Sequence, residues 1–269
     1  MTHERRLEAR TPLRRYANPF YGALRKAIDT ADTTVGALGI FLVAGLLVSA
    51  ACTAAFVEVA EHVRAGSTQM FDESIIRWLA AHRSGTLDAT MLEITALGTG
   101  TVVMVIVAVA SLFLVLTQHK YSALLLLVST FGGLVLDGVL KLGFNRPRPT
   151  IVVHAVQAVS SSFPSGHAMS SAIVYSTVAY LAARLHKRWW ARFLVMLTAL
   201  VLIVLICLSR LYLGVHYPSD VLAGVLVGLA WAAFCMATLE AIQKFGIRRD
   251  PRILEAEKPA PAPGVLPKH

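Results

Sequence analysis

Ionisable and small polar residues gather in three short segments of this 269-residue sequence, each at the end of a long apolar stretch. The segments are residues 141–149, 163–167 and 209–220. Charged side chains at the depth of a membrane are energetically costly and by default mark functional sites. The chemistry of the protein is therefore expected in these three segments.

The residue types in the segments suit the binding of a phosphate group. Lys141, Arg148 and Arg210 are cations with several hydrogen-bond donors for phosphate oxygens. Residues 164–167 read Pro-Ser-Gly-His, and this run is expected to open a helix whose first N–H groups and positive dipole end face an anion. The segments thus predict an anion cradle formed by Lys141, Arg148, Ser165, Gly166 and Arg210.

Two histidines remain for making and breaking bonds. His216 precedes Asp220 by four residues, and a turn through Pro218 would bring the carboxylate to one ring nitrogen. This contact would fix the tautomer and leave the other nitrogen free to attack phosphorus. His167 would protonate the leaving group and then help to activate the water that cleaves the phosphohistidine. The expected reaction is the hydrolysis of a phosphate ester or diphosphate.

A metal site is the competing interpretation of the same residues. The candidate ligands are His167, His216, Asp137 and Asp220. Three nearby cations outnumber the two carboxylates, so the site carries a net positive charge that repels a divalent ion and favours an anion. We therefore expect no metal and no other cofactor.

Two further charged residues lie in or next to the first segment. Asp137 precedes Lys141 by one helical turn, so the two are expected to form an ion pair that orients the lysine. A proton relay is the alternative role for Asp137. Arg146 is either a phosphate ligand or an interfacial charge.

The apolar stretches between these segments define the fold class. Hydrophobic residues make up 56% of the chain and charged residues 15%, which excludes an ordinary soluble domain, a disordered chain and a small disulfide scaffold. A membrane-spanning helix needs ~20 residues, a length that the two shortest stretches reach with flanking residues. We expect an all-α integral membrane protein with six transmembrane helices, at residues 35–57, 99–117, 121–140, 168–183, 193–208 and 221–239.

The distribution of basic residues predicts the orientation in the membrane. The first 33 residues hold 7 of the 25 Lys and Arg residues, so the net charge of +9 is attributed to cytoplasmic segments and not to a nucleic-acid partner. Because cytoplasmic loops carry the excess of Lys and Arg, both termini are expected to be cytoplasmic. The three polar segments then share the periplasmic or extracytoplasmic side of the inner (plasma) membrane.

Three regions follow from this topology. Residues 1–33 form a basic cytoplasmic segment, residues 34–243 form the membrane domain, and residues 244–269 form a cytoplasmic tail that is expected to be disordered. Within the membrane domain, residues 60–98 lie outside the membrane. Helical spacing predicts an amphipathic helix there at the outer interface, with an apolar face of Phe71, Ile75, Trp78 and Leu79 and with Asp72, Glu73, Arg77 and Arg83 elsewhere.

The three segments resemble the motifs of the type-2 phosphatidic acid phosphatase family. These are membrane lipid phosphatases whose core is related to glucose-6-phosphatase and the vanadium haloperoxidases. The family pattern is K-x6-R-P, then P-S-G-H, then S-R-x5-H-x3-D. This sequence matches it in order, over about residues 90–240, with Lys141 and Arg148-Pro149, then Pro164-Ser165-Gly166-His167, then Ser209-Arg210, His216 and Asp220.

The resemblance implies a role for each matching residue. His216 would be the nucleophile, His167 the general acid and Asp220 the partner of His216. The phosphate would be held by Lys141, Arg148, Ser165, Gly166 and Arg210, with Asp137, Pro149, Pro164 and Ser209 in support. The resemblance also implies catalysis without a metal, in agreement with the charge argument.

The expected function is that of a membrane lipid phosphatase acting at the outer leaflet. Undecaprenyl diphosphate is the favoured substrate, with phosphatidic acid, phosphatidylglycerol phosphate and the phosphate groups of lipid A as alternatives. A phosphatase of soluble organophosphates, of the glucose-6-phosphatase type, is the second hypothesis. A transporter of phosphorylated solutes is the third, although the charges gather at one face instead of crossing the bilayer. Neither the lipid nor the oligomeric state follows from the sequence.

Overall fold

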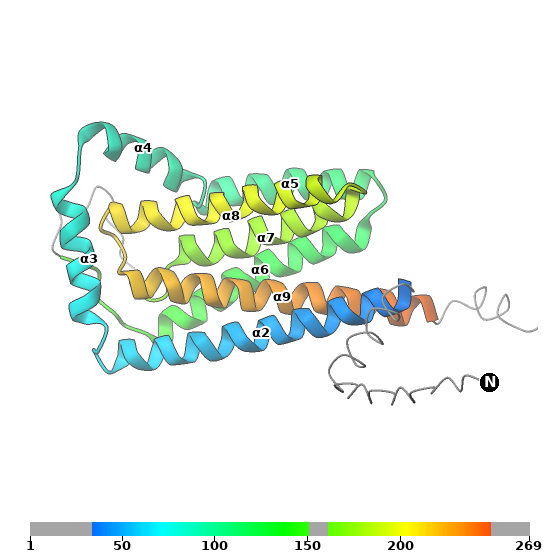
Figure 1. The fold of residues 1–269 in the computed structure, drawn as a ribbon, viewed down its shortest axis with the longest axis horizontal. Helices are drawn as coiled ribbons and strands as arrows, with labels where there is room; N and C mark the ends of the chain where they lie inside the picture. The colour runs from blue at the N-terminus through cyan, green and yellow to red at the C-terminus, as the bar shows by residue number, and fades with distance from the viewer. Residues whose placement is uncertain (1–33, 151–160, 249–269) are drawn as a thin grey trace, which may run out of the picture.

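The computed structural model describes residues 34–150 and 161–248, and all regular secondary structure in them is helical. Figure 1 shows long helices that lie side by side, with two shorter helices across one end. The long helices are α2 (Thr34–Arg64), α5 (Gly100–Leu116), α6 (Lys120–Gly143), α7 (Gly166–Leu185), α8 (Trp189–Tyr212) and α9 (Pro218–Arg248). Predictions for residues 1–33 and 249–269 lie outside the described residues.

Each of the six predicted stretches forms one long helix, but several helices extend beyond the apolar residues. α2 continues past residue 57 to Arg64 and ends before Gly66, whose φ of 71° lies in the left-handed region. α9 continues to Arg248, into the region expected to be a tail. An apolar stretch marks the part of a helix that contacts lipid, whereas the helix itself ends at a residue that breaks it.

Among the described residues, four helices are long and apolar enough to cross a membrane, and a fifth span results if the bent pair of helices at 85–96 and 100–116 counts as one. The four spans are Gly39–Arg64, Lys120–Gly143, Trp189–Tyr212 and Pro218–Ile242. Large apolar side chains such as Phe41, Val135 and Leu200 are exposed on them, as a lipid-facing surface requires. The chain is therefore a multi-pass membrane protein, and a sixth span through α7 stays a prediction.

Helix α7 lies inside the bundle and has ten buried residues out of 20. It packs against α8, α9 and α6. Glycines in α9 let two backbones approach closely, because a Cβ at Gly224 would lie 2.5 Å from the carbonyl oxygen of Ser165 and one at Gly228 2.7 Å from that of Met169. The start of α7 is therefore held directly against the start of α9.

The segment at residues 60–98, which is predicted to lie outside the membrane, forms α3 (Gln69–Ala81) and α4 (Gly85–Ala96), and these two helices lie across one end of the bundle (Figure 1). The predicted amphipathic helix is thus present as α3. Its aromatic residues Phe71 and Trp78 are exposed, whereas Asp72 and Ile76 are buried. The aromatic side of α3 therefore points away from the bundle, and the side that carries Asp72 faces the protein.

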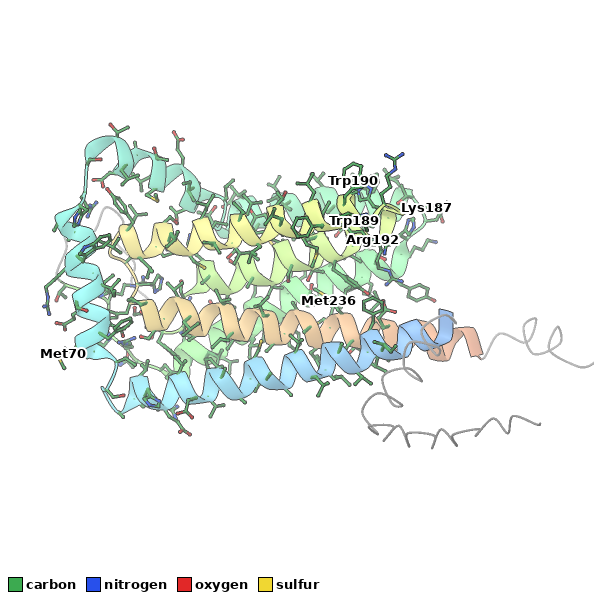
Figure 2. The ribbon with its side chains drawn as sticks, viewed as in Figure 1. Met70, Lys187, Trp189, Trp190, Arg192 and Met236 are labelled. Atoms are coloured by element: carbon green, nitrogen blue, oxygen red, sulfur yellow. The ribbon has the colours of Figure 1, made fainter. Side chains whose placement is uncertain are left out.

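Exposed residues differ between the two ends of the bundle. Figure 2 shows Met70 of α3 at the outer edge of one end. At the opposite end, Lys187, Trp189, Trp190 and Arg192 gather around the turn between α7 and α8. The two ends thus present different chemistry to the interfaces of a membrane.

Candidate active site

The three polar segments meet at the end of the bundle that α3 and α4 cover. The amide of Ser165 donates to the carbonyl of Asp220 over 3.0 Å, and the amide of Ser162 donates to the carbonyl of Arg146 over 2.9 Å. The guanidinium of Arg148 donates to the carbonyl of Val215 over 2.9 Å. Hydrogen bonds to the backbone therefore join the third segment to the other two, and the bond from Ser162 anchors the residue just before the second segment to the first.

Both ring nitrogens of the buried His216 are engaged. Nδ1 lies 2.8 Å from the carbonyl oxygen of Ser162, which can only accept, so Nδ1 carries the proton. Nε2 lies 3.2 Å from Nη1 of Arg148, which can only donate, so Nε2 presents a lone pair. This assignment from the partners gives the tautomer that nucleophilic attack through Nε2 requires.

Asp220 lies behind this ring without a hydrogen bond to it. The distance from its Oδ2 to Nδ1 of His216 is 3.8 Å, and the same oxygen accepts from the hydroxyl of Ser162 and, over 2.9 Å, from the amide of Tyr217. The spacing predicts that the carboxylate fixes the tautomer, but in the structure the carbonyl of Ser162 does so. The reason is that α9 begins at Pro218, so His216 lies in the preceding turn and not on a shared helix face.

The environment of His216 favours the neutral ring. Its pKa is lowered to about 4, chiefly because burial disfavours the imidazolium. Asp220 acts against this shift, and Arg148 and Arg210 add to it. At neutral pH the lone pair on Nε2 is therefore available.

Lys141, Gly166 and His167 line one end of a cavity of about 210 Å³ between α5, α6 and α7. Lys141 forms the ion pair that its spacing from Asp137 predicts, at 2.7 Å. Gly166 lies close to this pair, and a Cβ there would lie 2.8 Å from Nζ of Lys141, so the end of the lysine side chain would have to shift. The groups whose charges act on His167 are Arg210, His216, Lys141 and Arg148.

Two buried donors from α8 and the start of α7 lack a partner within the part of the chain that the structure describes. Among the described residues, neither the hydroxyl of Ser165 nor Nε of Arg210 makes a hydrogen bond. Nη1 of Arg210 is bonded to the hydroxyl of Thr95 over 2.8 Å, which orients the guanidinium. Because buried donors are almost always satisfied, each of these atoms is suited to donate to a bound anion.

The other residues of the predicted set lie around the site and do not line the cavity. Pro149 and Pro164 are buried in the chain that connects α6 with α7. The hydroxyl of Ser209 donates over 2.6 Å to the carbonyl of Ile206 within α8, so it faces its own helix. The structure thus brings the predicted cations and both histidines to one end of the bundle and keeps the Ser209 hydroxyl apart.

The acidic residues near the site are bound to cations. Asp137 pairs with Lys141, while Asp72 and Asp220 both pair with Arg146. Within residues 34–150 and 161–248, no group of three or more His, Cys, Asp or Glu side chains is placed to hold a metal ion. The donors around the cavity therefore suit an anion.

Comparison with known proteins identifies the family of the chain. A model of the PAP2 superfamily matches residues 122–244. Phosphatidylglycerophosphatase B of Bacillus subtilis (strain 168) is 31% identical over 196 residues, which cover 71% of this chain and 94% of the relative. The chain belongs to the PAP2 superfamily.

Further relatives of this PAP2 protein are also phosphatases. An undecaprenyl-diphosphatase of Sulfolobus acidocaldarius is 27% identical over 64% of this chain and 79% of the relative. A crystal structure of the transmembrane PAP2-type phosphatidylglycerolphosphate phosphatase of Bacillus subtilis matches with a TM-score of 0.66 and 28% identity, over 75% of this chain and 97% of that chain. This PAP2 protein is therefore a phosphatase.

Arg146 of the PAP2 protein has neither of the two roles that the sequence leaves open. Its side chain is 10% exposed and bonds to Asp220 at 2.6 Å and to Asp72 at 2.8 Å. Burial opposes its charge, but the two carboxylates outweigh burial, so the pKa of Arg146 is raised.

Sequence reasoning also passes over Ser162 and Asp72 as parts of the site. Asp72 lies 74 residues before Arg146, and no local pattern connects the two. The sequence does contain one indication that Asp72 is buried. Asp72 and Ile76 are one helical turn apart, so they share one face of α3, and this face is buried in the structure.

Proposed function

We propose that this PAP2 phosphatase removes phosphate from a lipid at the outer face of the membrane, through a phosphohistidine on His216 and without a metal ion. The observation that carries the proposal is a cationic site that adjoins an apolar cavity. Lys141 and His167 line one end of the cavity, and most of the other side chains that line it are apolar, such as Val103 and Met104. A headgroup phosphate can bind the cations while the start of its tail stays among apolar side chains.

In the first half-reaction, Nε2 of His216 attacks phosphorus, and the bond from phosphorus to the leaving oxygen breaks. His167 donates its proton to that oxygen. The proton on Nδ1 stays bonded to the carbonyl of Ser162, and Asp220 at 3.8 Å stabilises the positive charge that develops on the ring. The negative charge on the equatorial oxygens is stabilised by Lys141, Arg148 and Arg210.

In the second half-reaction, water attacks the phosphorus of the phosphohistidine and gives a proton to His167. The bond between phosphorus and Nε2 breaks, and inorganic phosphate leaves. His216 regains its lone pair, and His167 regains the proton that it donated. The cycle closes with groups from this chain, the substrate and one water molecule.

The proposed substrates are phosphate monoesters or diphosphates of lipids. Of the relatives described above, one is named for phosphatidylglycerophosphate and another for undecaprenyl diphosphate. These two lipids are therefore the leading candidates, followed by phosphatidic acid and the phosphate groups of lipid A. The shape of the cavity between α5, α6 and α7 would decide among their tails.

The proposal places the site on the extracytoplasmic side of the inner membrane, with six spans and cytoplasmic termini. Tryptophans collect at membrane interfaces, and cytoplasmic loops carry the excess of Lys and Arg. The end of the bundle opposite the site carries Trp189 and Trp190 beside Lys187 and Arg192 (Figure 2). This arrangement supports a cytoplasmic position for that end.

The test is phosphate release by the purified protein in detergent with EDTA present. The panel is phosphatidylglycerophosphate, undecaprenyl diphosphate, phosphatidic acid and glucose 6-phosphate, with His216→Ala as the control. We expect release from a lipid that EDTA leaves unchanged and that the variant loses. Phosphate release from glucose 6-phosphate alone would indicate that the substrates are soluble phosphate esters. Activity that needs an added divalent metal would overturn the mechanism.

A further inference from the structure

A buried row of alternating charges connects the outer helix α3 to the nucleophile. It runs from Asp72 on α3 through Arg146 to Asp220 on α9 and ends at the ring of His216. Oδ2 of Asp72 lies 2.8 Å from Nη2 of Arg146, and Nη1 of Arg146 lies 2.6 Å from Oδ1 of Asp220. Oδ2 of Asp220 then lies 3.8 Å from Nδ1 of His216. Both carboxylates have no exposed surface.

Asp72 also holds the first turn of α9. Its Oδ1 accepts from the amide of Ser219 over 3.0 Å, and its Oδ2 accepts from the hydroxyl of Ser219. A carboxylate at a helix N-terminus satisfies a free N–H group and interacts favourably with the helix dipole. Here the carboxylate comes from another helix, so α3 determines where the first turn of α9 and its Asp220 lie.

The charges in this row determine how strongly Asp220 can act on His216. When Nε2 bonds to phosphorus the ring becomes positively charged, and a negative charge near Nδ1 stabilises it. Arg146 by itself would cancel most of this effect, because its guanidinium is closer to Asp220 than the ring is. Asp72 offsets Arg146 and leaves the three side chains with one net negative charge.

We propose that Asp72 and Arg146 are positioning residues for the nucleophile. Arg146 holds Asp220 beside His216, and Asp72 both balances the charge of Arg146 and fixes the start of α9. Helix α3 is then a part of the catalytic apparatus as well as an interfacial element. This inference rests on the proposed function, because it takes His216 as the residue that attacks phosphorus.

The test is a double-mutant cycle between Asp72 and Asp220, measured as phosphate release from a lipid. Asp72→Asn keeps the shape of the side chain and removes its charge. We expect kcat to fall about tenfold with KM unchanged, because Asp72 lies outside the phosphate cradle. Asp220→Asn alone is expected to cause a larger loss. In that background, Asp72→Asn should lower kcat by less than about twofold, because it acts through Asp220.

Two controls separate this role from a general effect on folding. Arg77→Gln also removes an ion pair from α3, since Arg77 bonds to Glu73 at 2.7 Å. The side chain of Arg77 is 59% exposed, so we expect this substitution to leave turnover unchanged. Vanadate resembles phosphate and is expected to inhibit Asp72→Asn with the same inhibition constant as the wild type, because the cradle remains formed.

The inference would be overturned if Asp72→Asn kept the wild-type kcat. It would also be overturned if this substitution lowered kcat equally in the wild type and in the Asp220→Asn variant. Weakened inhibition by vanadate would also overturn it, because Asp72 would then act on the whole site and not on the nucleophile. These results require an active wild type. They are therefore distinct from failure of the proposed function, in which the wild-type protein releases no phosphate from any lipid.

Discussion

Two buried ionic clusters lie at opposite ends of the bundle and differ in how completely their carboxylates are bonded. In the outer cluster of Asp72, Arg146 and Asp220, each carboxylate oxygen accepts at least one hydrogen bond. In the opposite cluster, Oε1 of Glu240 accepts from Tyr180 and from Arg184. Oε2 of the same carboxylate has no partner among the described residues.

The difference indicates which buried charges fix the position of catalytic groups and which only stabilise the contact between two helices. The outer cluster joins α3, the start of α9 and Arg146 in the chain between α6 and α7, whereas the opposite cluster joins α7 to α9. A fully bonded buried charge has one preferred position, because any displacement leaves a polar group unsatisfied. Arg184 is 37% exposed, so solvent can replace part of its contact. We therefore expect activity to depend on the outer cluster and stability to depend on both.

The largest effect is expected from the residue that the outer cluster supports. His216→Ala removes the atom that is proposed to bond to phosphorus, so kcat should fall on the order of ten-thousand-fold. Phosphate release from a lipid measures the loss, and a phosphoprotein is expected in the wild type, but not in the variant, when the reaction is quenched during turnover. A purified variant that retained turnover would show that the outer cluster does not support a nucleophile.

The cradle beside the outer cluster is tested by Arg210→Gln. This change removes buried donors that stabilise the transition state, and the loss of one such interaction costs about 100-fold to 1000-fold in kcat. The matched control is Arg83→Gln, since Arg83 lies at the same end and pairs with Asp88 at 3.1 Å. Equal losses of kcat in the two variants would mean that total charge, and not the cradle, determines the rate.

The acidic side of the pH profile tests the burial of His216. The nucleophile must be neutral, and its pKa is lowered to about 4, so its contribution to kcat/KM should stay constant as the pH falls to about 5. Its contribution should be lost as the pH passes through about 4. A histidine of ordinary pKa would lose about tenfold per unit below about 6.5. The measurement is kcat/KM against pH, corrected for the ionisation of the substrate phosphate. A decrease in kcat/KM that begins near pH 6.5 would contradict the conclusion that burial lowers the pKa of His216.

The smallest effect on activity is expected from the cluster at the opposite end. Glu240→Gln keeps the shape of the side chain and removes the charge that Arg184 binds. The melting temperature in detergent should fall, because breaking a buried ion pair is destabilising, while kcat should stay within about twofold of the wild type. A loss of kcat comparable to that of Asp72→Asn would remove the distinction between the two clusters.

The chemistry of the site is more predictable from the sequence than the contacts that support it. Lys141 and Asp137 are one turn apart on one helix, so local spacing is enough to predict their ion pair. The predicted cations and histidines lie close to helix ends, which the apolar stretches locate. By contrast, Asp72 and Arg146 meet only after the chain has folded.

Two further differences between the prediction and the structure also arise from contacts that form only in the folded chain. The carbonyl of Ser162 orients His216 in place of Asp220, because the position of a backbone carbonyl in a turn depends on the folded chain. The apolar stretches locate all six long helices, but half of the residues of α7 are buried against other helices. A helix that contacts protein on most sides can carry serine, alanine and tyrosine, so its sequence alone does not establish that it crosses the membrane.

The contact between α7 and α9 at Gly224 affects how the two helices can move relative to each other. Bilayers of different thickness tilt and bend the helices that cross them. A Cβ at Gly224 would collide with the carbonyl of Ser165, and the amide of Ser165 is bonded to the carbonyl of Asp220 over 3.0 Å. The close approach and this hydrogen bond hold the two helix starts together. We therefore expect changes in thickness to be taken up elsewhere in the bundle, so that Ser165 and Asp220 keep their spacing in thin and thick membranes alike.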